Sequence, residues 1–218
     1  MNSVVIAKFG GSVIGIDGAS IPLIIERIKS LTGKSKVIAV FSAPLTTVDG
    51  NRRSLTDVAL ELGKIAEGGS VPDLTIVRKT YEKISELVDS KFQNECKMMI
   101  DDYLEKVKTE LEKVVKNKEF ADETRSKILA FSGEIIMSQM MEYILKSHSI
   151  KSQFVGLEDW PIITDNNIES TNFLVNESSK NIEHVEKMLE KNDVISIGGF
   201  IGRTKDGIMT TYERGGSD

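Results

Sequence analysis

The stretch "KFGGS" near the start of the sequence carries residue types that bind phosphate. Lys8 lies near the end of a short apolar run, Val4–Phe9, which predicts a buried strand, and Gly10, Gly11 and Ser12 follow it. A glycine loop after a strand lets an anion approach backbone N–H groups, and an ammonium suits the charge that develops on a transferring phosphoryl group. The spacing matches neither a Walker loop nor a dinucleotide fingerprint, so a structural turn beside a surface lysine is an equal alternative.

A second glycine pair, in "YERGGSD", lies at the other end of the sequence. Arg214 offers a planar fork that matches a carboxylate or a phosphate. The two glycines allow a close approach to the backbone, while Ser217 supplies a hydroxyl and Asp218 an anion. We expect the segments that carry Lys8 and Arg214 to share one edge of a parallel sheet.

Two further stretches supply polar groups to the same region. Ser42 comes directly after a second apolar run, in "FSAPLTT", and Thr46 and Thr47 add hydroxyls. In "FSGEIIMS", Glu134 interrupts an apolar run at an expected helix start. In one interpretation, the loop hydroxyls only cap a helix, and the Glu134 carboxylate only interacts favourably with the positive end of the helix dipole. Alternatively, Glu134 faces the cleft and holds a cationic group of a substrate.

Together these stretches describe a cleft for a polyanion and a zwitterion. The sequence has only two histidines, His148 and His184, and one cysteine, Cys96. These residues offer neither a Ser-His-Asp nor a Cys-His set, which disfavours a covalent hydrolase, and they make a His or Cys metal site improbable. Positioned charges without a nucleophilic triad favour phosphoryl transfer.

The elements that must position these groups alternate between strand and helix. Strands are expected at Val4–Phe9, Val37–Phe41, Gln153–Val155 and Val194–Ile197, and helices at 20–32, Leu55–Ala66, from Thr124 onward and at Ile182–Lys191. The first helix should pack through Leu23, Ile24, Ile28 and Leu31, and "SAPLTTVDGN" should be a loop. This order predicts a mainly parallel sheet with covering helices.

Residues 73–118 interrupt that alternation. Apolar residues recur there at helical spacing among Lys and Glu, which predicts two long amphipathic helices that form an insert. A packed helical hairpin with a solvated face is the favoured interpretation, and a partner-binding helix is the alternative. Phe200–Thr211 should form a hairpin-like piece before the terminal motif.

Composition excludes several classes of function. The chain has 218 residues and a formal net charge of −5, which argues against nucleic acid as the main partner. No apolar run reaches the roughly 18 residues of a membrane span, and the first residues do not form a signal peptide. A single cysteine excludes an internal disulfide and favours a reducing, cytoplasmic location.

The four motifs, "KFGGS", "FSAPLTT", "SGE" and "TTYERGGSD", occur in the order found in aspartate kinases of the amino-acid kinase superfamily, which the chain resembles over nearly its whole length. The resemblance implies a three-layer αβα fold, with the helical insert at about 73–118. It also implies transfer of the ATP γ-phosphate to the side-chain carboxylate of L-aspartate, the first step toward lysine, threonine and methionine. Mg²⁺ would be carried mainly by the nucleotide phosphates.

Carried over by position, the resemblance implies a role for each motif residue. Lys8 and Asp218 would be catalytic. The phosphates would bind to Lys8, Gly10, Gly11 and Ser12, and aspartate to Ser42, Thr47, Glu134, Arg214 and Ser217. The loop after Ser42 is short for the family, so Thr46 is an alternative to Thr47. Glu213 stands beside the anion site, and we expect it to face outward.

Length is the largest departure from the family. The resemblance implies that residues 1–218 are the N-terminal, aspartate-binding portion of a catalytic domain, without the nucleotide-base lobe or the regulatory domains. The chain alone should then be weakly active or inactive, and the full-length enzyme should be a homo-oligomer. The alternatives are an amino-acid kinase with a different acceptor and a non-catalytic amino-acid-binding module.

Overall fold

The computed structural model describes residues 3–213, apart from the side chain of Asp122. Its centre is a four-stranded parallel sheet with the order β1-β2-β6-β5. The strands are β1 (Val4–Phe9), β2 (Lys36–Phe41), β5 (Ser152–Phe154) and β6 (Val194–Gly198). Phe9 pairs with Phe41, and Phe41 pairs with Gly198, so the carboxyl ends of three strands lie level at one edge of the sheet. The predicted parallel sheet is confirmed, and its edge collects the loops that carry the motifs.

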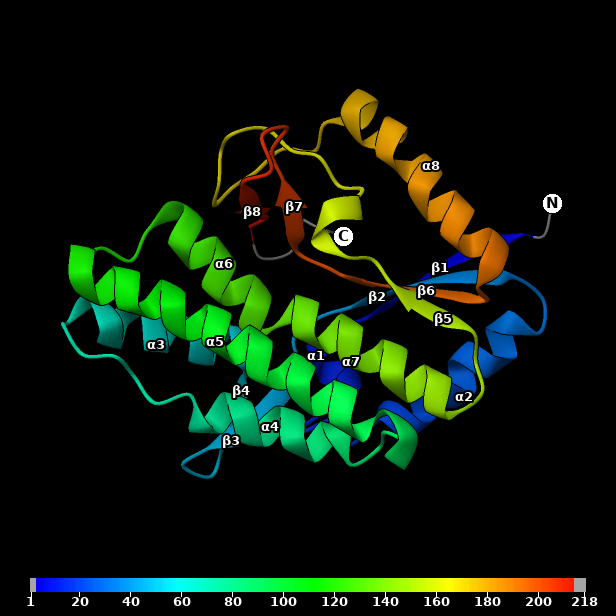
Figure 1. The fold of residues 1–218 in the computed structure, drawn as a ribbon, viewed down its shortest axis with the longest axis horizontal. Coiled ribbons are helices and arrows are strands. Elements are labelled where there is room, and N and C mark those ends of the chain that lie inside the picture. The colour runs from blue at the N-terminus through cyan, green and yellow to red at the C-terminus, as the bar shows by residue number, and fades with distance from the viewer. Residues whose placement is uncertain (1–2, 214–218) are drawn as a thin grey trace.

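Helices cover both faces of this sheet, which gives three layers (Figure 1). α8 (Val175–Lys191) lies on one face, while α2 (Ile21–Thr32) and α7 (Glu134–Ser147) lie on the other. The expected packing face of the first helix was partly wrong, because Leu23 is 74% exposed while Ile21 and Ile25 are buried. α8 also begins seven positions earlier than the apolar pattern indicated, since its first turns are mostly polar.

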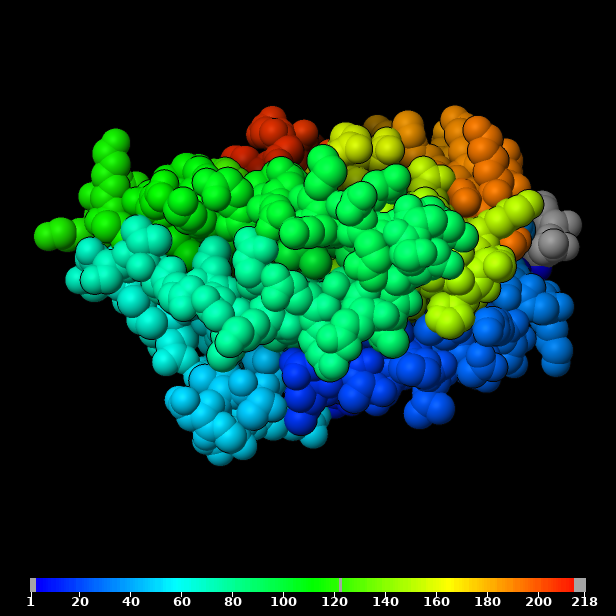
Figure 2. Space-filling view, turned by 60° about the horizontal axis from the view of Figure 1, so that its bottom comes forward, coloured from blue at the N-terminus to red at the C-terminus, as the bar shows by residue number. Residues whose placement is uncertain are grey.

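The helical insert is confirmed as two helices that pack on the rest of the core. α4 (Thr75–Ser85) and α5 (Gln93–Asn117) are joined by the short 3-10 turn η1 (Ser90–Phe92). α5 packs beside α3 (Leu55–Glu67), α6 (Asp122–Ser132) and α7, and α4 packs against α5. Figure 2 shows the insert as a continuous part of the outer surface, next to the N-terminal elements in blue.

The expected loop after Ser42 is instead a β-hairpin, which is a correction to the sequence prediction. β3 (Leu45–Val48) pairs in antiparallel fashion with β4 (Asn51–Ser54). Asp49 and Gly50 form its turn with φ of 49° and 76°. Positive φ at both central residues is what a two-residue hairpin with Asp-Gly requires, so "VDGN" was the overlooked signal. The predicted second hairpin is confirmed, with β7 (Ile201–Arg203) and β8 (Met209–Thr211).

The short elements α1 (Gly11–Ile14) and η2 (Leu157–Asp159) complete the fold. Among the described residues one stretch, Glu123–Ser147, is long and apolar enough to be considered a membrane span. However, 78% of its most apolar window is buried inside the protein, and Gly133 divides it into α6 and α7. Its apolar character is therefore accounted for by packing in the core.

Candidate active site

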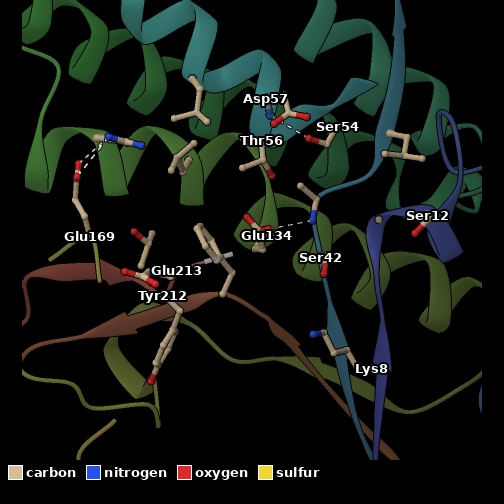
Figure 3. Close-up of a pocket in the computed structure, with 18 residues that line it drawn as sticks. Lys8, Ser12, Ser42, Ser54, Thr56, Asp57, Glu134, Glu169, Tyr212 and Glu213 are labelled. Carbon is tan, nitrogen blue, oxygen red and sulfur yellow. Dashed lines mark hydrogen bonds and ion pairs between the residues drawn. The ribbon is translucent and has the colours of Figure 1, made fainter. Parts of the chain in front are cut away.

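A cavity of about 710 Å³ opens at the carboxyl ends of β1 and β2 (Figure 3). Five residues that the sequence indicated line it together: Lys8, Gly11, Ser12, Ser42 and Glu134. They come from β1, α1, the end of β2 and the start of α7, segments far apart in the sequence. In Figure 3 the Lys8 and Ser42 side chains extend from neighbouring strands on one side of the cavity, and Glu134 lies between them and the opposite rim. The sheet register produces this arrangement, because it brings the ends of parallel strands to one edge.

Glu134 is the most unusual group in the cavity. Its side chain is 4% exposed, and its Oε1 accepts a hydrogen bond of 3.3 Å from the backbone N–H of Ala43. Among the described residues, its buried Oε2 has no hydrogen-bond partner. Burial raises the pKa of Glu134 to about 7, although the Ala43 N–H opposes part of that rise. A buried, half-satisfied carboxylate is costly for the fold unless a cationic or donor group binds it.

Close backbone packing places Glu134 where it is. A side chain at Gly133 would bring its Cβ within 3.0 Å of the Ala43 Cβ and 2.9 Å of the Leu129 carbonyl oxygen. A Cβ at Gly198 would lie 3.1 Å from the Glu134 Cβ. Glycines on both sides of Glu134 therefore let α7 begin against the ends of β2 and β6.

The two glycines of the first loop differ in their surroundings. A Cβ at Gly11 would lie 2.5 Å from the Ala43 carbonyl oxygen, so Gly11 is needed for close packing of α1 against the segment after β2. A Cβ at Gly10 would meet no described atom within 4 Å. Gly10 is not among the residues that line the cavity, but the space beside its backbone is open to a ligand.

The hairpin changes which hydroxyls reach the cavity. Thr46 is buried, and its Oγ1 accepts a hydrogen bond of 2.8 Å from Thr80. Thr47 follows it on β3, and its side chain is exposed on the other face of the strand. Neither threonine lines the cavity, so the arrangement does not support Thr47 or Thr46 as a substrate ligand.

Residues that the sequence reasoning missed occupy that part of the wall: Ser54, Thr56 and Asp57. They lie at the start of α3, where Ser54 caps the helix by accepting from the Asp57 N–H at 3.0 Å. The sequence does contain a signal for this helix start, because Ser54, a typical N-cap residue, precedes Leu-Thr-Asp at the start of an apolar helical pattern.

The opposite rim of the cavity is charged. Arg125 on α6 lies 3.2 Å from a carboxylate oxygen of Glu169. Glu213 also lines the cavity and accepts a hydrogen bond of 2.7 Å from the Ser170 hydroxyl. Glu213 is exposed, as expected, but Ser170 holds it at the rim of the cavity rather than away from it. Arg214, Ser217 and Asp218 lie outside the described residues, so their roles remain predictions.

Known proteins resemble this chain in sequence and in fold. Aspartokinases from Rickettsia felis and Rickettsia conorii are 38% and 34% identical to it over 87 residues, which are 40% of this chain and 21% of each relative. The structure is similar to E. coli aspartokinase III, solved with aspartate and ADP, with a TM-score of 0.80 and 19% identity. Clostridium acetobutylicum aspartate kinase gives a TM-score of 0.67 and 22% identity.

The extent of these matches differs between the two kinds of comparison. The structural matches cover 99% and 100% of this chain but only 44% and 43% of the two solved proteins, so the chain spans less than half their length. At such identities the likeness concerns the fold. The family model described as "Amino acid kinase family" matches residues 3–218, and the chain therefore belongs to the amino acid kinase family.

Proposed function

We propose that this chain is the aspartate-binding portion of an aspartate kinase, which transfers the γ-phosphate of ATP to the side-chain carboxylate of L-aspartate. The observation that carries the proposal is the Oε2 atom of Glu134, buried in the cavity without a partner among the described residues. An ammonium group is the substrate group that would satisfy this oxygen and offset the cost of burying the charge. An α-amino acid brings such an ammonium, whereas an N-acylated acceptor does not.

The remaining wall of the cavity suits the carboxylates of the same substrate. Ser42, Ser54 and Thr56 provide hydroxyl groups that can donate hydrogen bonds to carboxylate oxygens. We assign Arg214 and Ser217 to the substrate carboxylates and Asp218 to the phosphoryl-transfer centre, as the family resemblance implies. Thr56 takes the place that Thr47 was expected to fill.

The chemistry requires no strong general base. An aspartate side chain has an ordinary pKa of about 3.9, so its carboxylate is ionised at neutral pH and can attack the γ-phosphorus directly. The main task is to bring two anions together. Lys8 lies on the cavity wall at the end of β1, where its ammonium can neutralise charge on the phosphoryl group.

The first loop has room for the phosphates of ATP, because the space beside Gly10 is open. Residues 3–213 contain no group of three or more His, Cys, Asp or Glu side chains that could hold a metal ion. As the family resemblance implies, Mg²⁺ would bind mainly through the nucleotide phosphates, where it neutralises their charge.

The matches to aspartokinases support the choice of acceptor, and one of these proteins was solved with aspartate and ADP. A role in lysine, threonine and methionine biosynthesis, a homo-oligomeric full-length enzyme and a cytoplasmic location belong to the same proposal and rest on the family resemblance. So does the assignment of residues 1–218 to the N-terminal portion of the catalytic domain.

Calorimetric titration of this chain with matched ligands tests the proposal. L-aspartate should bind, and N-acetyl-L-aspartate should not, because it keeps both carboxylates but lacks the ammonium that Glu134 requires. L-glutamate and N-acetyl-L-glutamate test for a different acceptor, and tighter binding of either would refute aspartate as the substrate.

A second measurement separates an enzyme from a binding module. Because the proposal places the nucleotide-base lobe outside residues 1–218, ADP should bind only weakly in the presence of Mg²⁺, through its phosphates, and hydroxylamine should trap at most a trace of acyl phosphate from L-aspartate and ATP. Aspartate binding without any nucleotide binding would favour a non-catalytic amino-acid-binding module instead.

A further inference from the structure

The helical insert contacts the active site through two adjacent buried side chains of α4. Thr80 donates a hydrogen bond of 2.8 Å to Thr46 on β3, just after the segment that contains Ala43. Tyr81 donates to the carbonyl oxygens of Ser132 and Gly133, at 3.0 and 2.9 Å, just before Glu134. These two segments meet where the Ala43 N–H donates to Glu134. One turn of the insert therefore holds both sides of the hydrogen bond that orients the buried carboxylate.

The tyrosine hydroxyl acts at the point where the chain bends between two helices. α6 ends at Ser132, Gly133 lies between the helices, and α7 begins at Glu134 without a side-chain cap. The last carbonyls of a helix lack partners within it, and Tyr81 supplies a donor to this junction. Because Glu134 is the next residue, a shift of the junction would move its carboxylate directly.

Tyr81 does not act on the substrate itself. Its side chain is completely buried, and it is not among the residues that line the cavity. Burial raises its pKa well above the usual value, and the Glu134 charge raises it further, so the hydroxyl stays protonated and remains a donor. A phenylalanine would fill the same space and would leave two buried carbonyl groups without this donor.

We propose that Tyr81 is a positioning residue, through which the helical insert fixes Glu134 in the geometry that binds the substrate ammonium. This inference rests on the proposed function for the identity of the ligand, but the effect on Glu134 does not depend on any ligand. It gives the insert a specific task at the active site in addition to packing in the core.

The test compares Tyr81→Phe with Tyr103→Phe. Tyr103 is the matched control, because it is also a buried tyrosine of the insert, and its hydroxyl donates to Gln139 on α7 at 2.7 Å. Tyr103 does not line the cavity. Both variants lose one hydroxyl, so both should lower the thermal unfolding midpoint to a similar extent. The affinity for L-aspartate should fall about tenfold in Tyr81→Phe and stay unchanged in Tyr103→Phe.

Titration of the Glu134 carboxyl by carbon NMR, without ligand, gives the second measurement. In Tyr81→Phe the Ala43–Glu134 hydrogen bond, which lowers the Glu134 pKa, should weaken, so this pKa should rise further above its ordinary value, while Tyr103→Phe should leave it unchanged. If neither measurement separates the two variants, Tyr81 is only a packing residue and the proposal is wrong. If the wild-type chain does not bind aspartate while the Glu134 titration still moves only in Tyr81→Phe, the proposed function fails and the positioning role stands.

Discussion

The backbone N–H of Ala43 donates to the Glu134 carboxylate across 3.3 Å and joins two segments 91 positions apart in the sequence. Gly11 and Gly133 make this contact possible, because a Cβ at either position would collide with Ala43. Gly11 of "KFGGS" and Gly133 of "SGE" therefore serve the same structural purpose. This purpose is to bring three loops close enough to enclose a carboxylate.

Replacing Glu134 with glutamine should change how stability depends on pH. The Glu134 pKa is about 7 in the folded protein and 4.5 in its ordinary state, so the folded state binds the proton more tightly. The wild-type free energy of unfolding should therefore be highest below pH 4.5 and fall as the pH rises through 7, by roughly 3 kcal/mol from this group. Urea unfolding between pH 5 and pH 8, in steps of about one unit, measures this slope.

Glu134→Gln should flatten that part of the profile and be more stable than the wild type at pH 8, where the wild type buries a charge. The same variant should bind L-aspartate at least tenfold more weakly at pH 8, because it has lost the charge that pairs with the ammonium. A variant with the wild-type slope would show that Glu134 is not the group that titrates.

Thr56→Val should weaken binding of L-aspartate about tenfold, because valine keeps the shape of the side chain but removes the hydroxyl at the cavity wall. Thr47→Val is the control, since Thr47 is exposed on β3 and does not line the cavity. Calorimetric titration distinguishes the two. Weaker binding in Thr47→Val alone would restore the expectation made from the sequence.

Gly10→Ala should impair ADP binding, whereas Gly11→Ala should impair the stability of the fold. Alanine at Gly10 meets no described atom within 4 Å, so the fold should keep its thermal midpoint, while the methyl group should reduce ADP affinity by obstructing the phosphates. Alanine at Gly11 would place its Cβ 2.5 Å from a backbone oxygen of Ala43, so this variant should lose about 1–3 kcal/mol of stability. Calorimetry of unfolding and of ADP binding measures both effects. Equal stability losses would contradict this division of roles.

The sequence was sufficient for the parts of the site that follow from sheet topology. Lys8 and Ser42 end neighbouring apolar runs, and parallel pairing alone brings such ends together. The position of Thr47 was not predictable from the apolar pattern, because it depends on a hairpin that reverses the chain before α3. In the sequence, Tyr81 cannot be distinguished from the other apolar residues on the same helix face. Its contact with the carbonyls before Glu134 exists only after α4 packs against the junction between α6 and α7, which no local pattern indicates.

Lys8→Met should reduce the affinity for ADP about tenfold or more, with little effect on L-aspartate binding. The reason is that methionine keeps most of the apolar stem but removes the ammonium from the cavity wall where we place the phosphates. Lys36→Met is the control. Lys36 begins β2, at the opposite end of the same sheet, where it forms an ion pair of 2.9 Å with Asp193. Loss of that pair at a partly exposed site should leave ligand binding unchanged. If ADP binding fell equally in both variants, Lys8 would not contact the phosphates, and the first motif would be only a structural turn.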